Sequence, residues 1–244
     1  MTDKNLSTKL ETIKHLENGN ISALGLVPIG SNYTFLVDVE YKKQIVKAIY
    51  KPEAGEQPLL DFPPGTLYKR EYAAYLLSEL LTWHFVPTTI IREGPYGIGS
   101  LQQYIQGDFE TNYFTIRETQ LAKLKTIAIF DIITNNADRK ASHCFLDRTN
   151  TIWAIDHGLT FNEQWTLRTV IWDFINQTIP EFILTQLKIL KNQLDTQSSQ
   201  TIQLESMLTK KEIDKLNQRI ENLLLFQRFP SPDKDRRNIP FPWF

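Results

Sequence analysis

The stretch NNADRKASHCFLDRTNTIWAIDHG, residues 135–158, places Asp138, His143 and Asp156 within one short segment. Carboxylate oxygens and imidazole nitrogens bind metal ions and orient reacting hydroxyl groups. The three side chains can act together only if the chain folds back on itself between them. The local turn signals therefore decide whether this segment forms a site.

Those turn signals are Asp147 and Asn150, which favour a turn between the segments HCFL and TIWAID. Pairing about this turn puts His143 opposite Ala154. Asp156 then lies two residues further along the same face, because side chains alternate between the two faces of a strand. Diagonal neighbours of this kind are about 7–8 Å apart, within reach of a common ion or phosphate. The segment is predicted to form a hairpin that gathers these groups, with Asp138 approaching from the preceding loop.

The composition is that of an ordinary globular chain. In 244 residues, hydrophobic side chains make up 41% and charged side chains 23%, with a formal net charge of −1. The length allows a sizeable core, in one domain or in two lobes. Binding of nucleic acid or of an anionic membrane favours a basic surplus, which this total lacks, so neither partner is expected. No apolar run approaches the roughly 18 residues of a transmembrane segment.

The single cysteine, Cys144, cannot form an intrachain disulfide. The first residues, MTDKNLSTKL, lack the apolar core of a secretory signal. A reducing cytoplasm is therefore the expected location. Cys144 is expected to point into the core, away from its neighbour His143.

The first part of the chain predicts a sheet with one helix. Residues 24–51 alternate apolar and polar side chains around turns near 30–32 and 41–44, which is typical of a β-meander. Two further strands are predicted at residues 86–91 and 100–105. Between them and the meander, apolar residues follow the spacing of an amphipathic helix, at Leu67, Ala74, Leu77 and Leu81.

Beyond Gly107 the pattern changes to helices. The segment ETQLAKLKTIAIFDIITNN has a broad apolar face, and Pro180 suits the first turn of a helix over EFILTQLKILKNQL. Thr209 and Glu212 have the spacing of a capping box at the start of a last helix. The tail FPSPDKDRRNIPFPWF, residues 229–244, contains too many prolines for regular structure, and its aromatic rings are expected to pack onto the body.

These patterns predict an α+β chain with one change of character near its middle. Residues 1–107 would form an N-terminal lobe of antiparallel sheet plus a helix, and residues 108–244 a mainly helical C-terminal lobe. The segment of residues 135–158 falls in the second lobe.

The run NNADRKASH followed by IDHG resembles the catalytic and metal-binding loops of phosphatidylinositol 3/4-kinases, whose patterns are approximately D-R-x-x-x-N and D-[FN]-G. The chain is also similar to bacterial proteins of the phosphatidylinositol 3/4-kinase-like family, which carry an LRTVxWDF stretch after these motifs; LRTVIWDF stands here at residues 167–174. AIYKP, KREYAAY and GSLQQYI resemble the strand with the ATP-binding lysine, the helix after it and the strand before the interlobe hinge. Because several motifs occur in this order, the resemblance implies a two-lobed kinase-like fold with ATP as cofactor.

The resemblance implies a role for each matching residue. Lys51 would contact the nucleotide phosphates, with Glu71 as its ion-pair partner. Asp138 would be the catalytic carboxylate, and Asp156 would hold Mg²⁺. Taken alone, Lys51 and Glu71 would suit an exposed strand end and a helix surface. Lys47, four residues back on the same strand face, is a rival for the phosphate contact.

The remaining nucleotide contacts implied by the resemblance lie in two segments. The turn at Gly30 and Ser31 resembles a loop that covers the phosphates, although it suits an ordinary hairpin equally well. The adenine ring would be lined, chiefly by backbone groups, by Gln102, Gln103, Tyr104 and Ile105.

The chain departs from the lipid-kinase pattern at two positions. His143 stands where those kinases have an asparagine as second metal ligand. A histidine is a softer donor than Mg²⁺ prefers, so the metal could be Mn²⁺; alternatively, His143 hydrogen-bonds Asp156 and orients it. Lys140 stands where many phosphoinositide kinases carry histidine, which puts their acceptor chemistry in doubt. Arg139 is expected to anchor the loop through a salt bridge, and His157 to pack or hydrogen-bond rather than to bind metal.

Phosphoryl transfer needs a positioned carboxylate, oxygen ligands for Mg²⁺ and a cation on the phosphates. The expected function is therefore an ATP-dependent phosphotransferase that acts on an unidentified hydroxyl of a lipid, a protein or a small molecule. The alternative is a catalytically inactive, nucleotide-binding pseudokinase or an interaction module. In a third reading, Asp138 and Asp156 only cap and close turns, and the segment has no chemistry.

Overall fold

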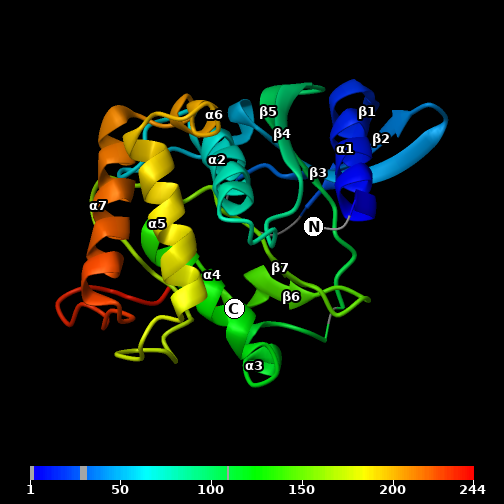
Figure 1. The fold of residues 1–244 in the computed structure, drawn as a ribbon. Helices are drawn as coiled ribbons and strands as arrows, with labels where there is room; N and C mark the ends of the chain where they lie inside the picture. Colours follow the sequence, from blue (N-terminus) through cyan, green and yellow to red (C-terminus); the bar gives the residue numbers. More distant parts are fainter. Residues whose placement is uncertain (1–2, 28–31, 109) are drawn as a thin grey trace.

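The protein has two lobes, one built on an antiparallel sheet and one mainly helical (Figure 1). The structure is a computed structural model that describes residues 3–27, 32–108 and 110–244. The predicted α+β class and the division into a sheet lobe and a mainly helical lobe are confirmed. The lobe boundary at Gly107 stays a prediction.

The sheet contains five strands in the order β1-β2-β3-β5-β4, with every neighbouring pair antiparallel. The strands are β1 (Asn20–Leu26), β2 (Phe35–Tyr41), β3 (Gln44–Pro52), β4 (Thr89–Gly94) and β5 (Gly97–Gln103). On one face, Tyr50 packs in a core with Leu16 of the first helix, α1 (Asp3–Asn18). Because side chains alternate along a strand, Lys51 lies on the opposite face.

A two-residue turn at Lys42 and Lys43 joins β2 to β3. These residues have φ values of 51° and 64°. Left-handed values at both central positions are those of a type I′ turn, whose twist matches that of the flanking strands. The hairpin predicted at residues 41–44 is thereby confirmed. The turn predicted near residues 30–32 falls mostly outside the described residues.

β4 and β5 occur where two strands were predicted, but both are displaced along the chain. β4 begins at Thr89 instead of Val86, and β5 ends at Gln103 instead of Ile105. Phe85 and Val86 are buried in the connection that leads into β4. Their apolar character therefore reflects packing of a connecting segment and not strand pairing.

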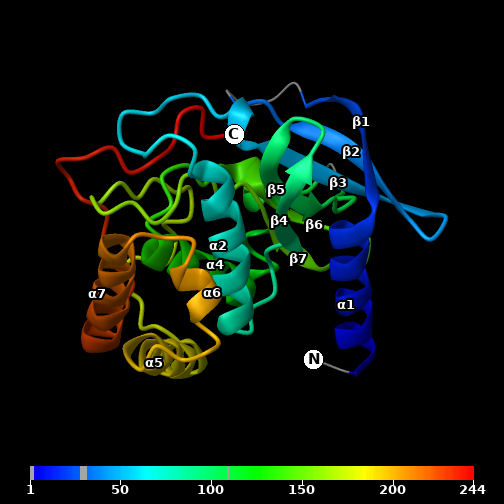
Figure 2. The ribbon, with the colours of Figure 1, turned by 90° about the horizontal axis from the view of Figure 1, so that it is seen from above.

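One long helix, α2 (Leu67–Leu80), belongs to the sheet lobe together with α1, and helices make up most of the second lobe. α2 packs beside β4 and β5 and lies on the opposite side of the sheet from α1 in both views (Figures 1 and 2). The remaining elements are η1 (Glu53–Gly55), α3 (Tyr113–Ile116), α4 (Leu121–Thr134), η2 (Ala141–His143), β6 (Cys144–Leu146), β7 (Ile152–Ala154), α5 (Glu181–Asp195), α6 (Ile202–Glu205) and α7 (Lys210–Phe226). Within the described ranges, no helix has the length and apolarity needed to cross a bilayer.

The helices predicted from periodicity and capping are confirmed. α4 is buried over most of its length and carries the core of the second lobe. α5 begins directly after Pro180, and α7 has Thr209 as its N-cap. The Thr209 hydroxyl accepts the Glu212 N–H at 3.3 Å, while the Glu212 carboxylate accepts the Thr209 N–H at 2.8 Å. This is the capping box that the spacing predicted.

The predicted hairpin of β6 and β7 forms, but in a different register. Cys144, and not His143, lies opposite Ala154. The loop holds one more residue than assumed, because Asn150 has a left-handed φ of 64°. A residue with a left-handed φ is typical of the last position in three-residue hairpin loops. The convergence of side chains argued from the original register was therefore based on a wrong pairing.

The tail is irregular, as predicted, but its rings are only partly packed. Phe229 is buried, and Trp243 meets Phe114 edge to face with ring centroids 5.2 Å apart. Phe241 and Phe244 are 79% and 62% exposed. The expectation that the tail aromatics pack onto the body is wrong for these two residues.

Candidate active site

The Lys51 ammonium joins three segments of the chain. At the end of β3, it donates to Oε1 of Glu71 on α2 and lies 2.8 Å from Oδ1 of Asp156, which follows β7. The other oxygen of Glu71 accepts the His157 N–H at 3.0 Å. Glu71 is buried, whereas the Asp156 side chain is 45% exposed. The structure thus brings the predicted phosphate contact, its ion-pair partner and the predicted metal ligand to one point that solvent reaches at Asp156.

Lys51 and Asp156 keep each other ionised, whereas burial raises the pKa of the third group, Glu71. Burial alone would lower the pKa of Lys51, but the carboxylates of Asp156 and Glu71 outweigh burial and raise this pKa above its ordinary range. The Lys51 ammonium in turn holds the pKa of Asp156 well below its usual range. Asp156 is therefore a carboxylate at neutral pH, which a ligand of a hard cation has to be.

A backbone kink aims Asp156 at this point. β7 ends at Ala154, and Asp156 has a left-handed φ of 61°. Aspartate tolerates this region better than most residues, because its short polar side chain can hydrogen-bond locally. The side chain reaches both Lys51 and His143 from this position. The predicted meeting of Asp156 and His143 is real, but a kink produces it and not a straight strand.

Asp138 lies in the loop of residues 135–140, called here the Asp138 loop. Its Oδ2 accepts a hydrogen bond from Lys140 Nζ at 2.7 Å, and its backbone N–H donates to Asn136 Oδ1 at 3.0 Å. Burial raises the pKa of Asp138, Lys140 opposes this shift, and the charge of Asp156 adds to it. The negative charge of Asp156 therefore acts on the protonation of Asp138, the other carboxylate with a predicted role.

His143 contacts Asp156 through Nε2, which lies 3.4 Å from Oδ2. Its Nδ1 lies 3.4 Å from the backbone nitrogen of Lys140, a group that can only donate. Nδ1 is therefore the acceptor, and Nε2 carries the proton that faces Asp156. Burial lowers the pKa of His143 to about 4, so the ring is neutral at pH 7. This tautomer suits a residue that orients Asp156, since a metal at Nε2 needs the opposite tautomer.

A buried arginine holds the Asp138 loop in place. The Arg139 guanidinium donates to both oxygens of Asp131 on α4, with Nη2 2.9 Å from Oδ1, and to the carbonyl of Ile155 at 2.8 Å. Its Nη2 also lies 2.7 Å from Nε2 of His157. Arg139, Asp131 and His157 are all fully buried. The expected anchoring role of Arg139 and the packing role of His157 agree with these contacts.

Sequence reasoning missed Asp131 as the partner of Arg139. An aspartate inside the apolar run IAIFDIIT is a signal that could have identified it, because a fully buried carboxylate needs a partner. Arg168, in the LRTVIWDF stretch, donates through Nε to the carbonyl of Ala137 at 2.7 Å. This contact supports the Asp138 loop, which is a structural role.

The C-terminal tail also supports the Asp138 loop. The carbonyl of Trp243 accepts the N–H of Ala141 at 3.0 Å, directly after the loop. The carbonyl of Asn238 accepts the N–H of Thr169 at 3.0 Å. The last residues of the chain are therefore bonded within three positions of Asp138, a relation that no local sequence pattern indicated.

Most of the predicted adenine-lining stretch, residues 102–105, is already hydrogen-bonded to other parts of the protein. The Gln103 N–H donates to the Thr88 carbonyl at 2.8 Å, and the Tyr104 N–H to the Lys47 carbonyl at 3.1 Å. The buried Gln102 side chain donates to the Thr89 hydroxyl at 2.9 Å. In the described part of the chain, Ile105 is the residue of this stretch without a hydrogen bond, so its backbone groups are free for a ligand.

Of the other predicted nucleotide contacts, Lys47 lies away from the carboxylates around Lys51. Gly30 and Ser31 lie outside the described residues. Lys47 is 51% exposed and pairs with Asp38 at 3.3 Å, instead of with the carboxylates around Lys51. The structure therefore separates Lys47 from the position that Lys51 holds.

The residues present fit a magnesium ion bound together with a nucleotide. In the described ranges, no group of three or more histidine, cysteine, aspartate or glutamate side chains could hold a metal. Mg²⁺ commonly uses one or two protein carboxylates and takes its other ligands from water and phosphate oxygens. Asp156, ionised and partly exposed, meets this requirement. Asp138 is a second oxygen donor in the same neighbourhood.

Comparison with known proteins finds a distant structural likeness and a clear sequence relative. No protein-family model matches the chain. The proinflammatory kinase CtkA of Helicobacter pylori is similar with a TM-score of 0.43 and 16% identity, over 84% of this chain and 97% of that chain, which is too distant to support a conclusion about activity. Protein Rv2133c of Mycobacterium tuberculosis is 32% identical over 263 residues, which cover 93% of this chain and 93% of that protein. Because this identity extends over nearly the whole of both proteins, the chain belongs to the family of Protein Rv2133c.

Proposed function

We propose that the protein is an ATP-dependent phosphotransferase that transfers the γ-phosphate to a hydroxyl acceptor. The observation that carries this proposal is the Lys51 ammonium held between Glu71 and Asp156, with Asp138 in the adjoining loop. A lysine fixed by a buried glutamate, next to an exposed carboxylate, provides a cation for phosphates beside a ligand for their metal. An ordinary surface lysine has no comparable set of partners.

Each residue has a stated part in this proposal. Lys51 binds phosphate oxygens, and Glu71 holds the long lysine side chain in position. Asp156 holds Mg²⁺, and His143 orients Asp156 through its Nε2–H instead of binding the metal. Mg²⁺, when bound, neutralises charge on the β- and γ-phosphates. Mn²⁺ is then not required, because a carboxylate oxygen and not an imidazole nitrogen faces the metal.

The proposed transfer moves the γ-phosphoryl group of ATP to the acceptor oxygen. The acceptor oxygen forms a bond to the γ-phosphorus, the bond from that phosphorus to the β–γ bridging oxygen breaks, and ADP leaves with the electron pair. The acceptor proton passes to the Asp138 carboxylate. Lys140, 2.7 Å from this carboxylate, favours its ionised form before the reaction and adds positive charge close to the transferred group.

Three classes of acceptor carry a hydroxyl group that suits this transfer: a lipid, a protein and a small molecule. The resemblance to phosphatidylinositol 3/4-kinases suggests a lipid head group, but a shared fold does not fix a substrate. A protein hydroxyl and a small soluble alcohol are equally compatible with the contacts around Asp138. The absence of a nucleic-acid partner and a cytoplasmic location stay predictions from the sequence.

Formation of ADP from ATP in the presence of Mg²⁺ tests the proposal. The full chain is incubated with ATP, and ADP is quantified by chromatography for the native protein, Asp138→Asn, Asp156→Asn and a control, Asp214→Asn, on the exposed surface of α7. We expect Asp138→Asn to keep ATP binding but lose turnover, Asp156→Asn to lose metal-dependent binding, and Asp214→Asn to resemble the native protein. Nucleotide-induced stabilisation without ADP formation, with either Mg²⁺ or Mn²⁺, would instead identify a pseudokinase.

A further inference from the structure

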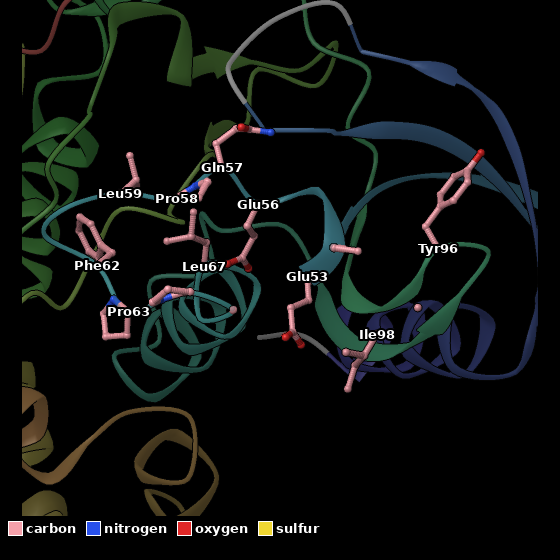
Figure 3. Close-up of a pocket in the computed structure, with 14 residues that line it drawn as sticks. Glu53, Glu56, Gln57, Pro58, Leu59, Phe62, Pro63, Leu67, Tyr96 and Ile98 are labelled. Atoms are coloured by element: carbon pink, nitrogen blue, oxygen red, sulfur yellow. The ribbon is translucent and has the colours of Figure 1, made fainter.

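A cavity of about 340 Å³ lies outside the site described above. It is formed by η1, the loop that leads from η1 into α2, and the turn between β4 and β5. Figure 3 shows two carboxylates, Glu53 and Glu56, between Phe62, Pro63 and Leu67 on one side and Ile98 and Tyr96 on the other. The volume falls at the lower end of the range for small-molecule sites. This cavity is called here the η1 pocket.

The walls of the η1 pocket are mainly apolar and its charges have one sign. The apolar lining includes Leu59, Phe62, Pro63, Leu67 and Ile98. In the part of the chain that the structure describes, neither Glu53 nor Glu56 takes part in a salt bridge. A cavity with apolar walls and uncompensated negative charge favours an occupant that is apolar along its length and positive at its end.

The Glu56 carboxylate is also held in place before any ligand arrives. Glu56 Oε1 accepts the N–H of Tyr68 at 2.8 Å, which fixes the side chain at the start of α2. Its other oxygen, Oε2, is buried and has no hydrogen-bond partner among the described residues. A buried carboxylate oxygen without a partner costs free energy unless a ligand satisfies it.

Gly65 makes room for the second carboxylate. It has a left-handed φ of 70°, and a side chain at this position would meet Glu53 Oε1 at 2.7 Å. Any L-residue here would be strained and would also displace the Glu53 carboxylate. The loop is thus shaped around Glu53.

We propose that the η1 pocket binds an ammonium or guanidinium group carried on an aliphatic stem. The stem packs on Leu59, Phe62 and Leu67, and the cation lies between Glu53 and Glu56. A lysine or arginine side chain of another protein and a free aliphatic amine share this chemistry. The inference does not depend on the proposed phosphotransferase activity.

The pocket is connected to the Lys51 site through its walls. Glu56 binds the backbone of Tyr68, one helical turn before Glu71 on the same helix. Phe62 and Leu67 pack in one cluster with Ala137, the neighbour of Asp138. The pocket therefore shares the helix α2 with the Glu71 carboxylate.

Binding of n-hexylammonium, measured by calorimetry with the full chain in the absence of ATP, tests this inference. Hexan-1-ol and hexanoate have the same stem with a neutral and a negative end. We expect hexylammonium to bind saturably, hexanol at least tenfold more weakly, and hexanoate not at all. Equal binding of hexylammonium and hexanol, or no saturable binding of hexylammonium at millimolar concentration, would overturn the proposal.

Two charge-neutral variants locate the site. In Glu56→Gln the amide oxygen can still accept the Tyr68 N–H, and Glu53→Gln changes an exposed residue, so the second remains informative if the first fails to fold. Both are expected to weaken hexylammonium binding at least tenfold, whereas Glu118→Gln, an exposed glutamate elsewhere, leaves it unchanged. Full affinity in both pocket variants would contradict the assignment.

The source of the cation is distinguished by two further ligands. Nα-acetyl-lysine amide represents a protein side chain, and spermidine represents a free amine. Tighter binding of the first supports a protein partner, and tighter binding of the second supports a soluble polyamine. Failure of both to compete with hexylammonium would overturn the proposed ligand class.

Discussion

The Lys51 ammonium lies 2.8 Å from the Asp156 carboxylate, although 105 positions separate the two residues in the chain. The same ammonium is bonded to Glu71 on the neighbouring helix. A strand of the first lobe and a loop of the second lobe thus contribute to one charged centre.

Lys51→Met should reduce turnover far more than Lys47→Met. The first removes the ammonium between Asp156 and Glu71, and the loss of one such electrostatic contact lowers rates by about 100-fold or more. The second breaks an exposed pair with Asp38, so the rate should stay within about twofold of the native value. Initial rates of ADP formation at saturating ATP compare the two. A larger loss in Lys47→Met would transfer the phosphate role to that residue.

Asp131→Asn should destabilise the protein by about 3–5 kcal/mol, since it leaves the Arg139 guanidinium buried without its counter-charge. Asp195→Asn is the matched control, because Asp195 pairs with Lys191 on the exposed surface of α5 and should contribute about 0–1 kcal/mol. Urea unfolding followed by circular dichroism gives both free energies of unfolding. Similar values for the two variants would show that the buried pair is not what anchors the Asp138 loop.

Cys144 should be unreactive until the protein unfolds. Burial raises the pKa of its thiol from 9.0 to about 12, and the side chain is inaccessible. An aromatic disulfide reagent at pH 8 should therefore label the native protein slowly and the urea-unfolded protein at once. Rapid labelling of the folded protein would place Cys144 at the surface.

The raised thiol pKa also has a consequence for stability at alkaline pH. Between the unfolded pKa of 9.0 and the folded value of about 12, the unfolded chain loses the proton and the native state keeps it. The contribution of Cys144 is thus complete below pH 9 and declines as the pH rises. Cys144→Ala should lose less stability than the native protein between pH 8 and pH 10 in urea titrations.

Removal of residues 239–244 should slow turnover while leaving the KM for ATP unchanged. The truncation retains Asn238, whose carbonyl binds Thr169, but removes the Trp243 carbonyl that accepts the Ala141 N–H. Loss of this bond next to the Asp138 loop should cost about 1–3 kcal/mol of stability. Phe241→Ala, a change at a ring that is largely exposed, is the control and should behave as the native chain. An unchanged kcat in the truncated protein would show that the tail does not position the loop.

The sequence predicted the parts of the site that depend on residue type and order. Lys51, Glu71, Asp138 and Asp156 were found because their motifs occur in a fixed order along most of the chain. The capping box at Thr209 and the buried face of α4 were predictable because both are local patterns. Local patterns and the order of motifs are properties of the sequence itself, so they can be identified before the fold is known.

The features of the fold and of the site that were not predicted depend on long-range contacts or on single backbone angles. A left-handed angle at Asn150 shifted the β6–β7 register, and another at Asp156 produced the contact with His143. The helix α1 was not predicted, although Leu10, Ile13 and Leu16 have helical spacing. The bond between Trp243 and Ala141 joins distant segments, and nothing near either residue indicates it.

The central claim is that one nucleotide site includes both Lys51 and Asp156. A crystal structure of the protein with Mg²⁺ and a non-hydrolysable ATP analogue tests it most directly. We predict phosphate oxygens within about 3 Å of Lys51 Nζ and a metal ion about 2.1 Å from an Asp156 oxygen. An analogue bound elsewhere, with Lys51 and Asp156 still paired only to each other and to Glu71, would contradict the account.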